Sequence, residues 1–446
     1  MILPLSISRL PSVSLFFESV VGDLADRINT VVCLPGRLPR ELVIDGVTDA
    51  CHRRRLHLVQ WSIVTSDADV PGLLVSREFG LRCQTADPPE VVQAWSAKEN
   101  SPDIVLLDAK TLSQVWIEFV HDLARELRRP TPSAPKVPVL CLIGVPSLGA
   151  ELPERDVNFR FRWWWGVLSQ CELRSLAQAA IADQQWSDAR SRWTSAILSA
   201  GSVGDPSLFV ELCSDPPTSI RAFHDSLSVA ANAAGWNEDN LASAGAGSMI
   251  CPSLIDAPNT LAGPPKGMRK LWALGALVNS VDEGSCLHSA ALVAVKRFYE
   301  LDHRVWREQV TPLFGWIDSI RVGFCERLTG RYKKGWSYRW VGPDNEIERQ
   351  RLLRDDFSCE VRHIRQLLRE NHIQEVKVWD AVLETMHNLR NNLAHGIPLE
   401  LTAVETLEQK LNEAPPIRAS EPRAAALLPA LAGDRDAVPG RPTRVR

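Results

Sequence analysis

The sequence predicts an α/β domain with a parallel, Rossmann-like sheet, followed by an all-α region that ends in a helical bundle. Two patterns support this fold class. In residues 1–150, apolar runs of strand length alternate with segments of helical periodicity, as in βαβ units. From about residue 160 onwards, apolar residues recur every three or four positions, which is the spacing of amphipathic helices. A chain of 446 residues is also too long for one ordinary core, so several domains are expected.

The strands of the first domain are expected where apolar residues are nearly continuous, at residues 29–34, 58–64, 103–109 and 137–145. Helices are expected after the first strand and between the last two, at residues 39–57 and 111–129. Later helices are expected within four segments, residues 267–281, 287–328, 346–371 and 376–395.

The predicted domain boundaries follow from these patterns and from breaks rich in Gly and Pro. The domains are a Rossmann-like sensor or interaction domain (1–150), a helical linker domain (151–234), a flexible linker (235–267), a helical domain (268–411) and a disordered tail (412–446).

Charge and cysteine usage limit the kind of partner. A net charge of −4 argues against broad attachment to nucleic acid or a membrane, so a nucleic-acid site has to be a local basic patch. No apolar stretch reaches the length of a membrane span, and the first residues lack the features of a secretory signal. The ten cysteines form no CxxC pair and no zinc-binding spacing. We therefore expect a cytoplasmic protein with no metal, no other cofactor and no membrane partner.

The first domain has the layout of a nucleotide site without its phosphate-binding residues. The order strand, loop, helix and a later strand ending in Asp108 resembles P-loop ATPases, in which that strand carries the carboxylate associated with magnesium. The loop CLPGRLPREL (residues 33–42) has one glycine and no Gly-Lys-Ser/Thr, whereas a phosphate cradle needs inward N–H groups, a lysine and a hydroxyl. The resemblance implies a degenerate ATPase-like sensor whose activator is a small nucleotide or a protein. A βαβ scaffold is the alternative.

An aromatic run follows this domain, with Arg160, Arg162 and three tryptophans at residues 163–165. Tryptophan beside arginine can stack on a base. Large aromatics in succession more often close a junction between domains, because neighbouring residues face different directions. Packing is the favoured interpretation.

The segment VWDAVLETMHNLRNNLAHG (residues 378–396) carries the most specific pattern. Its apolar residues are spaced by three and four, which predicts a helix with one buried face. A neighbouring polar face carries His387, Asn391 and His395, each four residues apart. Gly396 is expected to end the helix. In the last turn, the helix dipole favours a positively charged His395, and Arg390 can bind a phosphate through two N–H groups.

An arginine that binds a phosphate beside a histidine that transfers a proton suits RNA cleavage without a metal ion, by attack of the 2′-OH on the neighbouring phosphorus. The run RNNLAH resembles the motif of HEPN-superfamily ribonucleases, in which Arg, often followed by Asn, precedes His by four to six residues. The resemblance covers about residues 268–411. It implies catalytic roles for Arg390, His395 and Asn391, RNA as substrate, and a homodimer through this domain with both motifs in one cleft.

Two further groups could support such a site. Family members often carry an acidic and a basic residue on an earlier helix, and Asp318 and Arg321 are candidates, although their spacing also fits a plain intrahelical ion pair, which is favoured. The segment RYKKGWSYRW interleaves cations with aromatic rings, a composition suited to single-stranded RNA. Its candidate RNA-binding residues are Arg331, Lys333, Lys334, Trp336 and Arg339. A β-hairpin with aromatics packed on one side is the alternative.

The leading hypothesis is a metal-independent endoribonuclease that cleaves single-stranded RNA under the control of the first domain. That architecture is similar to regulated ribonucleases of phage defence and to toxin effectors. The alternatives are a non-catalytic HEPN-like binding or dimerisation module and a nucleotide-regulated switch.

Overall fold

The structure is a computed structural model, and it describes residues 7–63, 70–83, 87–127, 137–147, 152–153, 156–248, 263–280, 284–340, 346–370 and 376–414. The chain forms two compact units. The first unit comprises residues 1–314 and 391–405, and the second comprises residues 315–390 and 406–446. The predicted domain of residues 268–411 is thus divided between them, because its first helices pack against earlier helices of the first unit.

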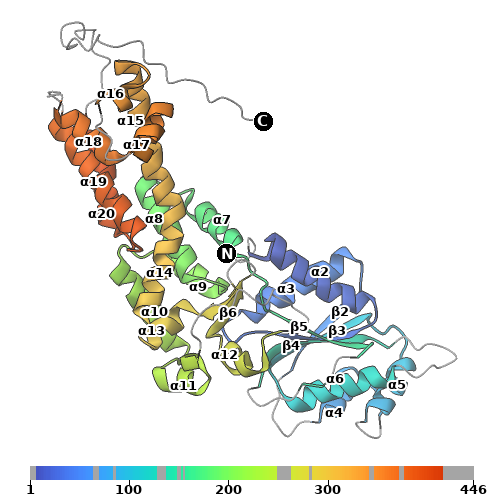
Figure 1. Ribbon diagram of the computed structural model, residues 1–446. Helices are drawn as coiled ribbons and strands as arrows, with labels where there is room; N and C mark the ends of the chain where they lie inside the picture. The colour runs from blue at the N-terminus through green and yellow to red at the C-terminus, as the bar shows by residue number, and fades with distance from the viewer. Residues whose placement is uncertain are drawn as a thin grey trace, which may run out of the picture. The chain divides into compact units, whose positions relative to one another are not determined.

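The first unit contains a five-stranded parallel sheet with the order β2-β3-β4-β1-β5 (Figure 1). The strands are β1 (Asn29–Cys33), β2 (Leu58–Ile63), β3 (Ile104–Leu112), β4 (Val139–Pro146) and β5 (Phe159–Trp163). The parallel sheet and its first four strands confirm the prediction. Strand β5 was not predicted, and it pairs along its whole length with β1. The order places β4 between β1 and β3, and Arg40, just after the loop that follows β1, forms an ion pair with Asp108 of β3.

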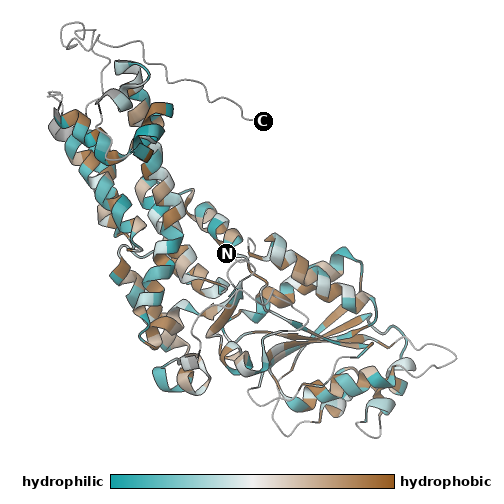
Figure 2. Cartoon of the chain, viewed as in Figure 1, coloured by the Kyte–Doolittle hydropathy of each residue, from teal (hydrophilic) through white to brown (hydrophobic). Residues whose placement is uncertain are grey.

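Helices cover both faces of this sheet (Figure 1). The pair α2 (Pro11–Ala25) and α3 (Arg40–Arg53) lies on one face. The other face carries α4 (Pro71–Glu78), α5 (Pro88–Ser96) and α6 (Gln114–Glu126). Figure 2 shows apolar residues along the strands, and β1 and β4 are buried over most of their length, as expected for parallel strands covered on both faces.

The rest of the first unit is mainly helical. Its α-helices are α7 (Gln170–Ile181), α8 (Asp188–Gly201), α9 (Pro206–Ser214), α10 (Ile220–Ala233), α11 (Glu238–Ser243), α12 (Arg269–Ala273), α13 (Ser289–Ala294) and α14 (Phe298–Gln309). Two 3-10 turns are η1 (Ala246–Ser248) and η2 (Lys266–Met268). Part of the predicted flexible linker is therefore helical, and residues 249–262 lie outside the described residues.

A β-hairpin interrupts the region predicted to be all-α. Strand β6 (Leu277–Ser280) pairs antiparallel with β7 (Gly284–Leu287), where the sequence predicted a helix over residues 267–281. The helix stops early because Gly275 adopts a left-handed conformation with φ 77°. The Gly275 N–H donates to the carbonyl of Trp272 at 2.8 Å, which closes the helix end.

All the regular secondary structure among the described residues of the second unit is helical. It contains α15 (Gly315–Tyr332), α16 (Trp336–Trp340), α17 (Glu346–Arg354), the 3-10 turn η4 (Asp356–Ser358) and α18 (Val361–Glu370). Two further helices, α19 (Val376–Ala394) and α20 (Leu401–Glu413), contribute residues to both units. A π-helical turn, η3 (Val310–Phe314), precedes α15 and contains Pro312, which has no N–H to donate within a helix.

The predicted tail, residues 412–446, lies almost wholly outside the described residues. Within the described part of the chain, no helix combines the length and the apolar character that crossing a bilayer requires.

A buried ionic network links the loop after β1 to the helices of the first unit. Arg37 Nε donates to Asp205 Oδ2 at 2.7 Å, and His288 Nε2 lies 3.0 Å from the same oxygen. Because His288 Nδ1 accepts the N–H of Ala290 at 3.1 Å, the ring proton lies on Nε2 and the ring is neutral. Burial alone would raise the pKa of Asp205, but His288 and Arg37 outweigh it and lower this pKa to about 2.

Asp205→Asn is expected to lower the thermal midpoint of unfolding by about 6 to 12 °C, since removing one partner of a buried ion pair costs about 3 kcal/mol. Asp188→Asn is the control, because Asp188 also pairs with an arginine but is 56% exposed, against 4% for Asp205. The control should shift the midpoint by less than about 2 °C. Calorimetry of the full chain measures both changes, and equal shifts would contradict the role assigned to Asp205.

Candidate active site at the end of helix α19

Helix α19 buries one face, as its sequence predicts. The apolar residues at spacings of three and four are all buried, namely Trp379, Val382, Leu383, Met386, Leu389 and Leu393. Within the second unit, the ring of Trp379 meets the ring of Phe324 edge to face, with centroids 4.8 Å apart. This stripe fixes the rotation of the helix about its axis, and it thereby decides which side chains reach the surface.

Gly396 ends α19 in the predicted way. Its φ is 79°, in the left-handed region. The N–H of Ile397 donates to the carbonyl of Asn392 at 2.9 Å, and the N–H of Gly396 donates to the carbonyl of Leu393 at 3.4 Å. These two bonds form a Schellman motif, which satisfies carbonyls of the last turn. His395 is consequently the C-cap residue, at the negative end of the helix dipole.

Side chains of the first unit hold the chain around this helix end. Trp306 Nε1 donates to the carbonyl of Leu393 at 2.5 Å. Gln309 forms two bonds with the backbone of Leu399, one to its N–H at 2.7 Å and one to its carbonyl at 2.9 Å. Trp193 Nε1 donates to the same carbonyl at 2.6 Å. The backbone is thus anchored on both sides of the helix terminus.

The side chains of the predicted motif are accessible. His395 is exposed, and Asn391, one turn earlier on the same face, is half-buried. Arg390 is 32% exposed, and its Nη2 lies 2.7 Å from Glu360 Oε2 within the second unit. Glu360 is itself 28% exposed. The carboxylate orients the guanidinium, which carries five N–H donors in all.

The helix directs Arg390 and His395 to different sides. They are five positions apart in the sequence, which corresponds to a rotation of about 140° around an ideal helix axis. Asn391 and His395, four apart, share a face. The motif therefore presents one group formed by Asn391 and His395 and a separate guanidinium.

The predicted RNA-binding segment comprises the end of α15, a short turn and α16, and it is not a β-hairpin. Lys333 and Lys334 are exposed between α15 and α16. Trp336 is completely buried, and its Nε1 donates to Thr329 Oγ1 at 2.9 Å. Its ring faces are therefore covered by protein, and the expectation that Trp336 stacks on a base is corrected.

The side chains of the other two candidates in this segment, Arg331 and Arg339, lie outside the described residues.

Asp318 and Arg321 form the intrahelical ion pair that their spacing favours, with Nε 2.7 Å from Oδ1. Arg321 Nη1 also donates to the carbonyl of Cys359 at 3.0 Å. This arginine ties α15 to the turn before α18, so its contacts are structural.

In the first unit, the arginines in and just after the loop that follows β1 form ion pairs with carboxylates of the same unit. Arg40 forms an ion pair with Asp108, the acidic residue of β3, and Ser62 Oγ lies 3.3 Å from the same carboxylate. Arg37 belongs to the network with Asp205. The charge of the Asp108 carboxylate is thus neutralised by arginine.

The aromatic run after the sheet is packed, as favoured from the sequence. Trp163, Trp164 and Trp165 are all buried, and the first of them ends β5. Arg162 donates to the buried Asp23 through Nε at 2.6 Å, and Arg160 donates to it through Nη1 at 2.6 Å. Both arginines hold α2 on the sheet.

Two features of the site were not predicted. Glu360 pairs with Arg390 across the sequence, and no local pattern signals that contact. The arginines of α18 recur at helical spacing on its exposed face, a signal that the sequence does contain.

Among the described residues, no three His, Cys, Asp or Glu side chains lie close enough together to hold a metal ion. Comparisons of the chain with family models, curated proteins and solved structures find no match.

Gly396→Ala is expected to lower the thermal midpoint by about 2 to 4 °C, because a Cβ in the left-handed region costs about 1 kcal/mol. A Cβ at this position meets nothing within 4 Å, so the cost is backbone strain alone. Gly323→Ala, inside α15 and equally unobstructed, should instead raise the midpoint through helix propensity. Gly396→Asn should cost less than Gly396→Ala. Thermal scans of the three variants test this, and a stabilising Gly396→Ala would contradict the assigned helix end.

Proposed function

We propose that this chain is a metal-independent endoribonuclease of the HEPN type that cleaves single-stranded RNA at the end of α19. The observation that carries the proposal is the exposed His395 at an anchored helix terminus, preceded by an arginine that a carboxylate orients. Imidazole groups can transfer the protons of this reaction, and a guanidinium can stabilise the charge that develops on the phosphate.

The proposed chemistry follows from those two groups. A neutral histidine takes the proton of the 2′-OH, and the 2′-oxygen forms a bond with the adjacent phosphorus. The bond from phosphorus to the 5′-oxygen breaks, and an imidazolium donates a proton to that leaving oxygen. Arg390 stabilises the negative charge that develops on the phosphorane oxygens. The products carry a 2′,3′-cyclic phosphate and a 5′-hydroxyl.

A second copy of the chain completes the site in this proposal. The reaction needs one histidine as base and another as acid, and each chain supplies one His395. The angular separation of Arg390 and His395 on one helix also favours a composite site, in which the arginine and histidine of different protomers face the same phosphate.

In this proposal, the first unit regulates the ribonuclease activity. Its parallel sheet resembles that of P-loop ATPases, but the arginine pairs at Asp108 and Asp205 use the cations of the β1 loop internally. We therefore assign to it the binding of a regulatory nucleotide or protein and not ATP hydrolysis. A ribonuclease under such control fits a defence or toxin effector.

His395→Ala is expected to reduce cleavage of single-stranded RNA in EDTA by about 10³-fold or more, since general acid–base catalysis contributes about 10² to 10⁴. His52→Ala is the matched control, because His52 is also exposed and also lies in the last turn of a helix, α3. The control should retain full activity. Gel analysis of a labelled oligoribonucleotide measures both rates, and undiminished cleavage by the His395 variant would overturn the proposal.

A further inference from the structure

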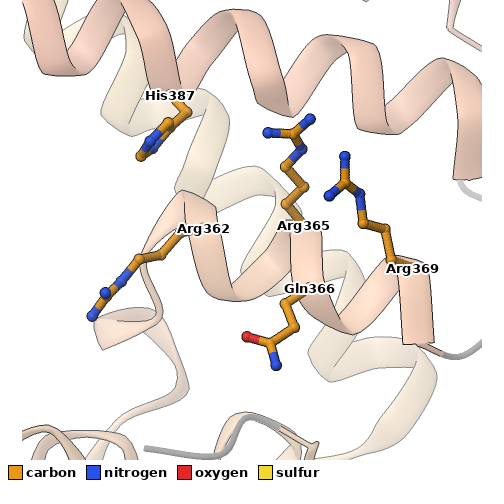
Figure 3. Close-up of a pocket in the computed structure, with 5 residues that line it drawn as sticks. All are labelled: Arg362, Arg365, Gln366, Arg369 and His387. Carbon is orange, nitrogen blue, oxygen red and sulfur yellow. The ribbon is translucent and has the colours of Figure 1, made fainter. Parts of the chain in front are cut away.

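A basic pocket lies between α18 and α19 in the second unit. It has a volume of about 320 Å³ and is lined by Arg362, Arg365, Gln366, Arg369 and His387 (Figure 3). In Figure 3, Arg365 and Arg369 extend from α18 towards the helix that carries His387, and His387 extends back towards α18. The lining thus consists of three guanidinium groups, an imidazole and an amide.

The sequence of α18 explains this arrangement. One face of the helix is buried, and its apolar residues are Val361, Ile364, Leu367 and Leu368. The arginines occupy the intervening positions with spacings of three and four, so that they share the opposite face. Arg362 and Arg369 remain 53% and 54% exposed, and a ligand from solvent can reach both.

Carboxylates pair with the arginines of the pocket. Arg362 Nη2 lies 2.9 Å from Glu348 Oε1, and Arg365 Nη2 lies 3.0 Å from Glu384 Oε1.

Asp380 is shared by Arg365 and Arg369. Arg365 Nε lies 2.7 Å from Asp380 Oδ1, and Arg369 contacts Asp380 with Nε at 2.9 Å and with Nη2 at 2.8 Å. The hydrogen bonds from Arg369 and Arg365 lower the pKa of Asp380 to about 2, and it stays ionised at neutral pH. These contacts to Asp380 use Nε and Nη2 and do not involve Nη1 of either arginine. Asp380 therefore holds the two planar groups side by side in a fixed orientation, which limits the entropy lost when an anion binds.

The pocket adjoins the candidate active site along α19. His387 lines the pocket and precedes Arg390 by three residues, a rise of about 4.5 Å along the helix. An RNA strand with its scissile phosphate at Arg390 has neighbouring phosphates close to this pocket. Arginine is well suited to such phosphates, because its N–H groups match their oxygens in pairs.

We propose that Arg362, Arg365, Arg369 and His387 bind backbone phosphates of the RNA strand next to the scissile linkage. The identity of this ligand rests on the proposed ribonuclease function. The pocket itself gives no sequence preference, since phosphates are the same at every nucleotide.

The test measures RNA binding separately from cleavage. The full chain carrying His395→Ala is titrated into a labelled single-stranded oligoribonucleotide at several salt concentrations, and fluorescence anisotropy reports binding. Adding Arg362→Gln and Arg369→Gln should weaken binding about 10-fold or more. It should also lower the slope of log affinity against log salt by about 1.4, or about 0.7 for each lost phosphate contact on a single strand.

The control variant carries Arg53→Gln and Arg192→Gln in the same background. These arginines are also paired with carboxylates, are 56% and 38% exposed, and lie in the first unit. The control has the same net charge as the pocket variant, and it should bind like its parent. The double variant Arg362→Lys with Arg369→Lys keeps the charge and should preserve the salt slope.

Each outcome decides the proposal. An unchanged slope and affinity in the pocket variant, an equal loss in the control, or no RNA binding by the parent would overturn it. Competition with inorganic phosphate or a nucleoside monophosphate is a further arm. If either one binds through the pocket arginines while RNA binding is independent of them, the site serves a free phosphate compound, and the RNA assignment is wrong.

Failure of the nuclease proposal gives a different pattern. If the chain with intact His395 does not cleave RNA, but RNA binding still depends on the pocket arginines, the nuclease proposal is wrong and the pocket proposal stands. If cleavage depends on His395, but the pocket variants leave RNA binding unchanged, the pocket proposal is wrong and the nuclease proposal stands.

Discussion

The left-handed conformation of Gly396 is the constraint on which the candidate site depends. A residue with a side chain would resist this conformation, and a continued helix would move His395 away from the terminus. The Schellman bonds and the indole of Trp306 satisfy the last carbonyls, which leaves His395 exposed at a rigid position. Catalytic groups act best on such anchored elements, because each reacting atom has to be placed within a fraction of an ångström.

Arginine has opposite roles in the two units. In the first unit, Arg37 and Arg40 form ion pairs with the carboxylates of Asp205 and Asp108. In the second unit, Arg365 and Arg369 are also paired, but Asp380 aligns them along a pocket and does not enclose them. The surroundings of each guanidinium therefore decide whether it can bind an anion, and this contrast is why we propose the phosphate-binding pocket in the second unit.

The spacing of apolar residues along the sequence was sufficient to predict the strands and helices whose burial follows a regular period. Continuous apolar runs located four parallel strands, and spacing by three and four located the buried face of α19. Long-range contacts were not predictable in this way. Strand β5 exists because it pairs with β1, the ring of Trp336 is buried by tertiary packing, and Glu360 meets Arg390 across the fold. The hairpin after Gly275 was missed because its apolar residues also fit a helix, although the glycine itself was a local signal.

The chemistry proposed for this chain is tested most directly by the ends of the RNA products formed in a chelating buffer. Attack by the 2′-OH under the control of His395 predicts fragments with a 2′,3′-cyclic phosphate and a 5′-hydroxyl, detectable by mass spectrometry. A substrate with 2′-deoxyribose at the cleaved position should remain intact. Fragments with a 3′-hydroxyl and a 5′-phosphate, which require attack by water, would contradict the account.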